Sequence, residues 1–323
     1  MRGAKAIIRE VQRTKKNISP PPPFTTDTLL REANSILGLD VDRTMKIAQD
    51  LFESGLITYH RTDSTRVSDT GLAVARNYIS EKFSPSSFVP RRWDEEGAHE
   101  CIRPTRPLDT DGLMQMIRQG ILQLQVNLTR DHIRLYDLVF RRFIASQMPS
   151  SKVLEITVRV VGPYFEKEFV FTKEVLEDGF AKILPLKVRK MGDEGEYIIE
   201  DATYKKVATV PLYTQADVIR LMRERNIGRP STYSKIVKTL LDRKYVIPVK
   251  GGKLVPTGLG RQVYQYLSEM FGDVISEKKT VEVLTKMDLV ENGKVDYMDV
   301  LNEFYIEVYE KICSKIQDAC PKH

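Results

Sequence analysis

Three stretches of the chain alternate between apolar and polar positions with the period of two that is typical of strands. Residues 6–13 alternate loosely. Residues 153–161 and 164–171 alternate more strictly, and the Gly162-Pro163 pair between them predicts a hairpin turn. Shorter strands are expected within residues 188–206, with a turn at 192–195, and in a hairpin at 246–255 around Gly251-Gly252.

Elsewhere the apolar residues recur every three to four positions, which is the spacing of the buried face of a helix. Gly38 and Gly55 mark the expected ends of the first two helices, and Ser68 marks the expected start of the third. Helices are predicted at about residues 27–38, 42–54, 69–79, 112–128 and 129–148, and from residue 214 almost to the end.

Four consecutive prolines, at positions 20–23, separate the first strand from the first helix. Proline fixes its backbone φ angle and lacks an amide donor, so this run predicts a stiff connector and a domain boundary. The order β, α, β, α indicates a helical region inserted into a β-rich domain. We therefore expect an α+β protein, mainly α, divided into residues 1–17 (β), 18–137 (α), 138–210 (β) and 211–323 (α).

The composition narrows the class of protein. The 323 residues allow about two domains, and a hydrophobic share of 41% suffices for packed cores. No run of about 18 apolar residues occurs, and the first residues lack the apolar core of a signal peptide, so we expect neither a membrane span nor secretion. Three cysteines without a close CxxC pair predict neither a disulfide framework nor a zinc cluster, and they fit a reducing, cytoplasmic setting.

The formal net charge is +6, from 50 Lys plus Arg against 44 Asp plus Glu. This excess permits binding to nucleic acid without requiring it, because a mild excess of lysine is common on soluble surfaces. The positions of the basic residues therefore decide the question, and they gather in three segments that also carry other reactive groups.

The first segment, residues 57–66, follows the helix end at Gly55 and reads ITYHRTDSTR. In an extended segment, Tyr59 and Arg61 point to the same side. A phenol oxygen can act as a nucleophile, and a guanidinium two positions on is placed to clamp the phosphate that it attacks. On local chemistry alone, a polar loop with a buried tyrosine is the more common explanation.

The second segment, residues 95–107, contains His99, Cys101 and two arginines among prolines. A rigid basic loop of this kind suits contacts to backbone phosphates, and Arg103 is its first arginine. A lone histidine is more often structural than catalytic, and the spacing of His99 to Cys101 fits no zinc pattern. We therefore expect no metal site here.

The third segment, residues 223–233, reads RERNIGRPSTY. Gly228 is expected to end one helix, and the hydroxyls of Ser231 and Thr232 are expected to cap the next. A helix N-terminus presents free amide donors, which bind phosphates readily. An ordinary helix-turn-helix with solvated arginines explains the same residues. Two arginines add positive charge at and beyond this helix start: Arg229 and Arg243.

Together and in this order, the segments resemble the type IA DNA topoisomerases. The resemblance rests on four motifs, at residues 20–26, 55–64, 98–105 and 228–233 with Asp242-Arg243, and extends over nearly the whole chain. Residues 142–148 are also similar to a family segment. Four motifs in the same order are far more specific than any one alone, so the purely structural explanations lose most of their weight. The chain looks most like the topoisomerase part of reverse gyrase, on His60 beside Tyr59 and on residues 95–109.

The resemblance implies a reaction. In the family, the tyrosine that matches Tyr59 attacks one DNA strand and forms a 5′-phosphotyrosyl bond, another strand or duplex passes through the gap, and the break is resealed without ATP. Arg61 would stabilise the charge of the transition state. Further DNA contacts are expected from His99, Arg103, Arg229, Ser231, Thr232 and Arg243.

The resemblance also implies a fold, a type IA topoisomerase-like partial toroid. In it, a helical catalytic domain that bears the tyrosine is inserted into a β-rich arch, and a helical domain that binds single-stranded DNA follows. This order agrees with the pattern of elements. It assigns residues 18–137 to the catalytic domain, 1–17 and 138–210 to the arch, and 211–323 to the single-strand-binding domain.

The chain departs from the family at its beginning. Type IA enzymes begin with a Toprim domain that supplies acidic Mg²⁺ ligands, whereas only residues 1–19 precede the prolines here. Asp40 and Asp42 lie between two predicted helices and are interpreted as capping residues, and no GxxxxGK[ST] pattern occurs. We expect no cofactor on this chain, Mg²⁺ through a partner Toprim domain, and ATP only through a partner helicase module.

Two hypotheses from different functional classes follow. In the first, the chain is the tyrosine-bearing part of a type IA topoisomerase, as a subunit of a split enzyme or a fragment, and needs a second chain with Toprim and helicase-like modules. In the second, it is a catalytically idle remnant that clamps single-stranded DNA in the same basic groove. The two differ in whether Tyr59 forms a covalent bond to DNA.

Overall fold

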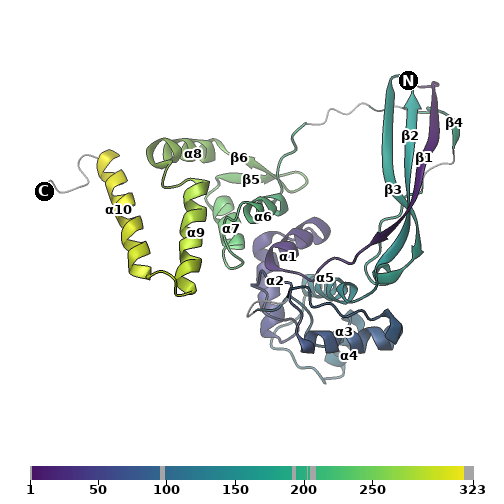
Figure 1. Cartoon of the computed structure of the whole chain (residues 1–323), viewed down its shortest axis with the longest axis horizontal. Coiled ribbons are helices and arrows are strands. Elements are labelled where there is room, and N and C mark those ends of the chain that lie inside the picture. Colours follow the sequence, from purple (N-terminus) through teal and green to yellow (C-terminus); the bar gives the residue numbers. More distant parts are fainter. Residues whose placement is uncertain (1, 95–98, 191–193, 202, 204–208, 316–323) are drawn as a thin grey trace. The chain divides into compact units, whose positions relative to one another are not determined.

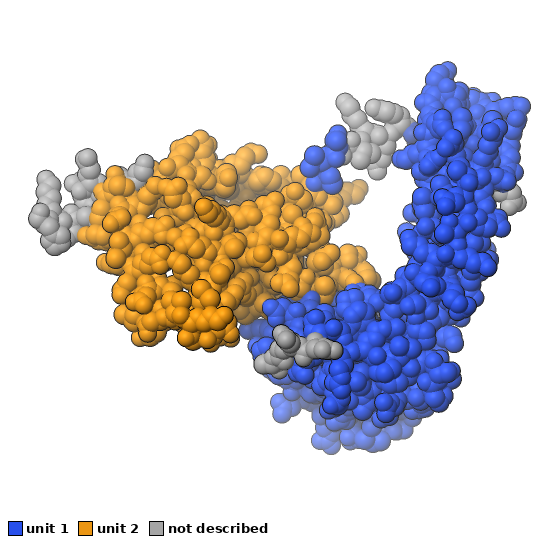
Figure 2. Space-filling view, viewed as in Figure 1, with its two compact units in different colours: residues 1–26, 47–211 blue, residues 27–46, 212–323 orange. Residues whose placement is uncertain are grey.

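The computed structural model describes residues 2–94, 99–190, 194–201, 203 and 209–315. These residues form ten α-helices and six β-strands, which confirms the mainly helical α+β class (Figure 1). The chain divides into two compact units (Figure 2). Unit 1 contains residues 1–26 and 47–211, and unit 2 contains residues 27–46 and 212–323. Residues 27–46 thus pack with the last third of the chain rather than with the rest of the 18–137 range.

Unit 1 carries an antiparallel four-stranded sheet in the order β3-β2-β1-β4 (Figure 1). The hairpin predicted at Gly162-Pro163 is confirmed. β1 is longer than the predicted strand at 6–13, because its pairing with β2 continues to Ile18, opposite Ser151. The strands are β1 (Lys5–Ile18), β2 (Ser151–Gly162), β3 (Phe165–Glu177) and β4 (Gly195–Ile198).

The two faces of this sheet differ in polarity. Ile156, Val158 and Phe171 belong to an apolar cluster on one face. Alternation along β2 places Arg159 on the opposite face, where it pairs with Glu168 on β3 at 2.7 Å. A sheet with one apolar face is the usual antiparallel arrangement.

The helices of unit 1 pack around α5. Tyr136, Phe140 and Phe143 of this helix are buried, and Phe140 contacts the ring of Tyr78 edge-on with centroids 4.8 Å apart. The predicted helix at 112–128 is wrong beyond residue 118, because Gly120 adopts a φ of 70° and ends the helical path. These helices are α3 (Asp69–Lys82), α4 (Thr110–Arg118) and α5 (Arg130–Ser146), preceded by the end of α2 (Val41–Glu53).

The proline connector is fastened to α5. The Nε of Arg142 donates to the carbonyl oxygen of Pro22 at 2.6 Å, and its guanidinium lies 4.8 Å from the centroid of the Phe24 ring. Phe24 is fully buried and forms an isolated β-bridge with Ile102. The connector therefore brings Phe24 to the segment around residue 102.

Unit 2 joins an early and a late part of the chain in one core. Leu30, Val41 and Met45 pack against Ile219 and Tyr233. Gly38 has a left-handed conformation and ends the first helical stretch, as predicted. The elements are α1 (Thr26–Glu32), a π turn (Ala33–Leu37), the start of α2, α6 (Gln215–Glu224), α7 (Tyr233–Asp242), β5 (Val246–Val249), β6 (Lys253–Pro256), α8 (Gly258–Phe271), α9 (Glu277–Glu291) and α10 (Tyr297–Lys315).

Two further features of the structure concern membrane-spanning helices and the state of the cysteines. Among the described residues, no helix is both long enough and apolar enough to cross a membrane. Cys101 is buried with a free thiol, whereas Cys313 is disulfide-bonded, which the sequence analysis does not predict.

Gly179→Ala is predicted to destabilise unit 1. Gly179 has a φ of 49°, and a methyl group there would lie 2.6 Å from the carbonyl oxygen of Pro149 and closer still to that of Ser150. We expect the free energy of unfolding, measured with urea, to fall by about 2–4 kcal/mol. Gly120→Ala is the matched control: its φ is 70° but the space is open, so only backbone strain of about 1–2 kcal/mol is added. Equal losses in the two variants would contradict the steric argument.

Candidate active site

The loop that carries Tyr59 pairs with the second basic segment. The amide of Thr58 donates to the carbonyl oxygen of Arg103 at 2.9 Å, and the amide of Arg103 donates to the Oγ1 of Thr58 at 3.0 Å. The Oγ1 of Thr58 in turn donates to the carbonyl oxygen of Cys101 at 2.7 Å. Two segments that are separate in sequence thus form one site.

A second set of hydrogen bonds holds the other side of the loop. The Oγ1 of Thr26 donates to the carbonyl oxygens of His60 at 2.8 Å and Thr62 at 3.0 Å, and it accepts from the amide of Thr62 at 2.9 Å. The amide of Thr26 also donates to the carbonyl oxygen of Thr62 at 2.8 Å. The backbone is therefore fixed on both sides of Tyr59.

Tyr59 itself remains accessible. Its side chain is 42% exposed, although rings surround part of it. Phe52 meets it edge-on with ring centroids 5.3 Å apart, His60 does so at 5.6 Å, and the ring of His99 lies 6.2 Å away. A buried core tyrosine, the common alternative from local chemistry, does not describe this residue.

His60 is fully buried directly beside Tyr59. Burial and, as a smaller cause, the positive charge of Arg61 together lower the pKa of its imidazole to about 4, while Glu53 opposes the shift. The ring is therefore neutral at pH 7. Neither ring nitrogen has a hydrogen-bond partner within the described part of the chain.

Arg61 and His99, two of the predicted site residues, are exposed. The positive charge of Arg61 lowers the pKa of His60, its neighbour in the chain. No hydrogen bond or ion pair within the described residues occupies the guanidinium of Arg61. His99 is held through its backbone, whose carbonyl oxygen accepts from the Nε of Arg66 at 3.3 Å. Both side chains are available to a ligand beside the phenol.

Arg103, in contrast, is only 4% exposed and serves the framework of the site. Its guanidinium binds the carboxylate of Glu100 through two hydrogen bonds, of 2.8 and 3.0 Å, and it contacts the Oγ of Ser68 at 3.3 Å. Ser68 also caps α3, as predicted, by accepting from the amide of Gly71. The pair therefore ties the second basic segment to the start of α3.

The Glu100 carboxylate shows how these contacts balance burial. Burial works against its charged form, but the hydrogen bonds from Arg103 and Ser68 outweigh that effect and lower its pKa. The Arg103 charge is therefore compensated at neutral pH. Removing either partner would leave a buried charge alone, which is far more costly than losing a surface ion pair.

In unit 2, Arg229 and Thr232 form a turn before α7. The Oγ1 of Thr232 accepts from the amide of Arg229 at 2.8 Å, and the guanidinium of Arg229 pairs with Asp288 on α9 at 2.6 Å. Thr232 occupies the cap position of α7, but its hydroxyl forms no capping bond to the helix, so that expectation is wrong. Its hydroxyl is engaged with the turn instead.

Ser231 and Arg243 lie at opposite ends of α7, and both are exposed. This helix has ten residues and is therefore about 15 Å long. Ser231 and Arg243 are thus too far apart to bind the same phosphate. Because unit 2 is described by itself, none of these residues is placed relative to Tyr59.

Sequence reasoning missed several residues that build the site. Thr26 and Phe52 are not among the predicted site residues, although both contact the Tyr59 loop. The pairing of Glu100 with Arg103 had a visible signal, because the two stand three positions apart with opposite charges.

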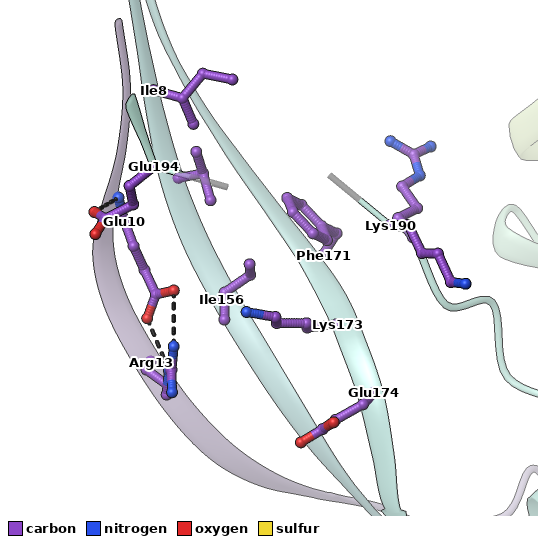
Figure 3. Close-up of a pocket in the computed structure, with 11 residues that line it drawn as sticks. Ile8, Glu10, Arg13, Ile156, Phe171, Lys173, Glu174, Lys190 and Glu194 are labelled. Carbon is purple, nitrogen blue, oxygen red and sulfur yellow. Dashed lines mark hydrogen bonds and ion pairs between the residues drawn. The ribbon is translucent and has the colours of Figure 1, made fainter. Parts of the chain in front are cut away.

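A hollow of about 590 Å³ lies on the sheet of unit 1 (Figure 3). Ile156 and Phe171 line its apolar part, and Arg13 on its rim is bound to Glu10 through two hydrogen bonds of 2.8 and 3.1 Å. Figure 3 shows Lys190 pointing away from Phe171. Since acidic and basic side chains both stand on the rim, this hollow does not favour an anion, and Tyr59 remains the stronger candidate.

The described residues contain no group of three or more histidine, cysteine, aspartate or glutamate side chains that could hold a metal ion. The donor set for Mg²⁺ is therefore not found in this part of the chain.

Comparison with known proteins places this chain in a family. A family model described as DNA topoisomerase matches residues 1–302. The reverse gyrase of Pyrococcus furiosus is 49% identical over 311 residues, which are 95% of this chain and 26% of that protein. Reverse gyrase 1 of Aquifex aeolicus is 48% identical over 309 residues, which are 95% of this chain and 27% of that protein. The chain thus spans about a quarter of the length of these curated relatives.

A solved structure has the same fold. Full-length topoisomerase I from Thermotoga maritima is 34% identical, and the match covers 97% of this chain and 52% of that one with a TM-score of 0.73. This chain belongs to the type IA DNA topoisomerases. Its similarity to a part of reverse gyrase, expected from His60 and residues 95–109, is confirmed by the relatives.

Glu100→Gln is predicted to destabilise unit 1 in a pH-dependent way. At pH 7 the free energy of unfolding should fall by about 3 kcal/mol, because the charge of Arg103 stays buried without a partner. Folding lowers the pKa of Glu100, so its contribution is complete above the ordinary value of 4.5 and is lost as the pH falls through the folded-state pKa. Denaturation curves of the two proteins should therefore converge in acid.

The matched control for this prediction is Glu177→Gln. Glu177 pairs with Lys152 at 2.6 Å, but both side chains are about half exposed or more, at 61% and 49%. Exposed pairs add little stability, so this variant should unfold almost like the unaltered protein. A gap for Glu100→Gln that stays constant between pH 7 and pH 3 would contradict the assignment.

Proposed function

We propose that this chain supplies the nucleophile of a type IA topoisomerase reaction, in which the phenol oxygen of Tyr59 attacks a phosphorus atom of one DNA strand. The observation that carries the proposal is an exposed phenol on a loop whose backbone is hydrogen-bonded on both sides. A fixed, accessible nucleophile reduces the entropy that the reaction must overcome.

The proposed step is a transesterification. The bond from the Tyr59 oxygen to phosphorus forms, and the bond from phosphorus to the 3′ oxygen of the preceding nucleotide breaks. The phenol proton ends on that 3′ oxygen, so a 5′-phosphotyrosyl ester and a free 3′-hydroxyl result. The reverse attack by the 3′-hydroxyl reseals the strand. One phosphate ester bond replaces another, and no nucleoside triphosphate is consumed in either direction.

The other residues of unit 1 have separate roles in this proposal. Arg61 is exposed without a partner among the described residues, so its guanidinium is free to stabilise the charge on the phosphate as the new bond forms. His99 is exposed, with its ring 6.2 Å from that of Tyr59, and suits a contact to the same strand. We assign Arg103 to the framework rather than to DNA, because Glu100 occupies its guanidinium.

Unit 2 is proposed to bind the single-stranded segment through its backbone phosphates. Ser231 and Arg243 are the more accessible of the four predicted contacts there. Arg229 would have to exchange Asp288 for a phosphate, and Thr232 acts by shaping the turn that presents Ser231. Contacts of this kind fix the strand without reading its sequence.

The reaction is proposed to need a further part of the protein. The described residues offer no group of Mg²⁺ ligands, and the reverse gyrases that the chain matches are about four times as long. We propose that a Toprim domain, on a second chain or in a longer polypeptide, holds Mg²⁺, and that ATP acts only through a helicase-like module. Mg²⁺ bound there would supply positive charge beside the reacting phosphate.

Tyr59→Phe is predicted to abolish the covalent adduct with DNA. The variant, mixed with a Toprim-bearing partner and single-stranded DNA, should bind the strand normally because it loses only one hydroxyl. Denaturing gel electrophoresis with end-labelled DNA measures the adduct. Tyr164→Phe is the control, since Tyr164 is 78% exposed in the β2–β3 turn and its substitution should change neither property.

An adduct that survives Tyr59→Phe refutes the assignment of Tyr59 as the nucleophile. Binding of DNA by the unaltered chain without any adduct favours the hypothesis of a catalytically idle clamp.

Binding of single-stranded DNA is predicted to weaken with salt through Arg61 and Arg243. Each arginine that contacts a phosphate contributes about 0.7 to the slope of log affinity against log salt, so Arg61→Ala and Arg243→Ala should each reduce it by about that amount. Arg159→Ala is the control, because Glu168 already pairs with Arg159 on the sheet. Fluorescence anisotropy gives the slopes, and slopes equal to that of the unaltered chain in both test variants count against a phosphate-binding surface.

A further inference from the structure

His60 is a buried residue whose ring contacts the proposed nucleophile, Tyr59. Its side chain is fully buried, and its ring contacts Tyr59 edge-on at 5.6 Å and Phe52 at 6.1 Å. Its backbone carbonyl oxygen accepts from the Oγ1 of Thr26 at 2.8 Å. The imidazole is therefore held next to the Tyr59 ring and is not exposed to solvent.

Both ring nitrogens of His60 lack a hydrogen-bond partner within the described residues. The chain offers a comparison in His132, which is also buried but is satisfied: its Nδ1 lies 2.7 Å from the Oγ1 of Thr129, and its Nε2 lies 3.0 Å from Asp50. An unpaired buried polar group costs free energy, whereas an apolar side chain of similar size does not. Folding alone therefore gives no reason for an imidazole at position 60.

We propose that His60 is a positioning residue for Tyr59, kept at the expense of stability because its polar ring orients the phenol for attack. The inference rests on the proposed function of Tyr59. In the resting fold the imidazole sets the angle of the Tyr59 ring by its edge. The N–H group and the nitrogen lone pair of the imidazole have no partner within the described residues. Both can form hydrogen bonds beside the phenol when Tyr59 engages the phosphate. Polar residues that reduce stability often mark functional sites.

The neutral state of the ring suits this role. Burial and the charge of Arg61 both lower the pKa of His60, and the opposing effect of Glu53 is smaller. A neutral imidazole does not repel the guanidinium of Arg61, which the proposed reaction needs beside the phosphate. It also keeps one donor and one acceptor, which neither a leucine nor a methionine provides.

The first experiment compares His60→Leu, His60→Gln and the control His132→Leu in the presence of a Toprim-bearing partner. His60→Leu should leave the melting temperature unchanged or raise it by about 1–3 °C, keep its affinity for single-stranded DNA, and form the covalent adduct about 10-fold more slowly or worse. His60→Gln, which keeps a donor and an acceptor, should recover part of the rate. His132→Leu should lose melting temperature and keep the rate of adduct formation while it is folded.

The second experiment uses this chain alone, labelled with 3-fluorotyrosine. The ¹⁹F resonance that is missing from Tyr59→Phe identifies Tyr59. It should be a single sharp line in the unaltered chain and in His132→Leu, and it should broaden or split in His60→Leu. An unchanged Tyr59 resonance in His60→Leu overturns the proposal, as does a His60→Leu chain that forms the adduct at the original rate.

The two experiments separate this inference from the proposed function. If the unaltered chain forms no adduct, or if the adduct persists in Tyr59→Phe, the proposed function fails. The ¹⁹F resonance and the melting temperature then still decide whether His60 orients Tyr59 at the expense of stability. A lower melting temperature in His60→Leu, with an unchanged Tyr59 line, would show an ordinary structural histidine.

Discussion

The site depends on the hydrogen bonds that join the Tyr59 loop to residues 101–103. The amide of Thr58 donates to the carbonyl oxygen of Arg103, and the hydroxyl of Thr58 accepts from the amide of Arg103 and donates to the carbonyl oxygen of Cys101. Thr26 holds the loop from its other side. The bonds of the Thr26 hydroxyl are buried, where an unmade bond costs about 1–3 kcal/mol, and those of the Thr58 hydroxyl are partly buried. They allow a loop to carry an exposed phenol without the loss of order that exposure usually brings.

The two arginines of this site differ in burial and in pairing. Arg103 is buried and compensated by Glu100, whereas Arg61 is exposed and uncompensated within the described residues. A buried pair is costly to break but contributes little to binding, and an exposed cation is free to meet a phosphate. In unit 2, Arg229 is paired with Asp288, but this pair is partly exposed, and Arg243 is exposed without a partner among the described residues.

Local signals in the sequence predicted the elements better than the site. The glycine at position 38, the serine cap at 68 and the turn at Gly162-Pro163 act over a few residues, and all three are confirmed. The helix expected at 112–128 stops early because one left-handed glycine outweighs the apolar spacing. Whether an arginine is buried depends on contacts between segments that are distant in the sequence. The pattern of residues along the chain does not reveal those contacts. The roles assigned to the site residues stay predictions.

The central claim is that the oxygen of Tyr59 forms the bond to DNA. The most direct measurement is to digest the covalent complex of the chain, its Toprim-bearing partner and a labelled oligonucleotide, and to locate the nucleotide by tandem mass spectrometry. The account predicts a nucleotide attached by its 5′ phosphate to the peptide that contains Tyr59, on that residue. A nucleotide on any other side chain would contradict it.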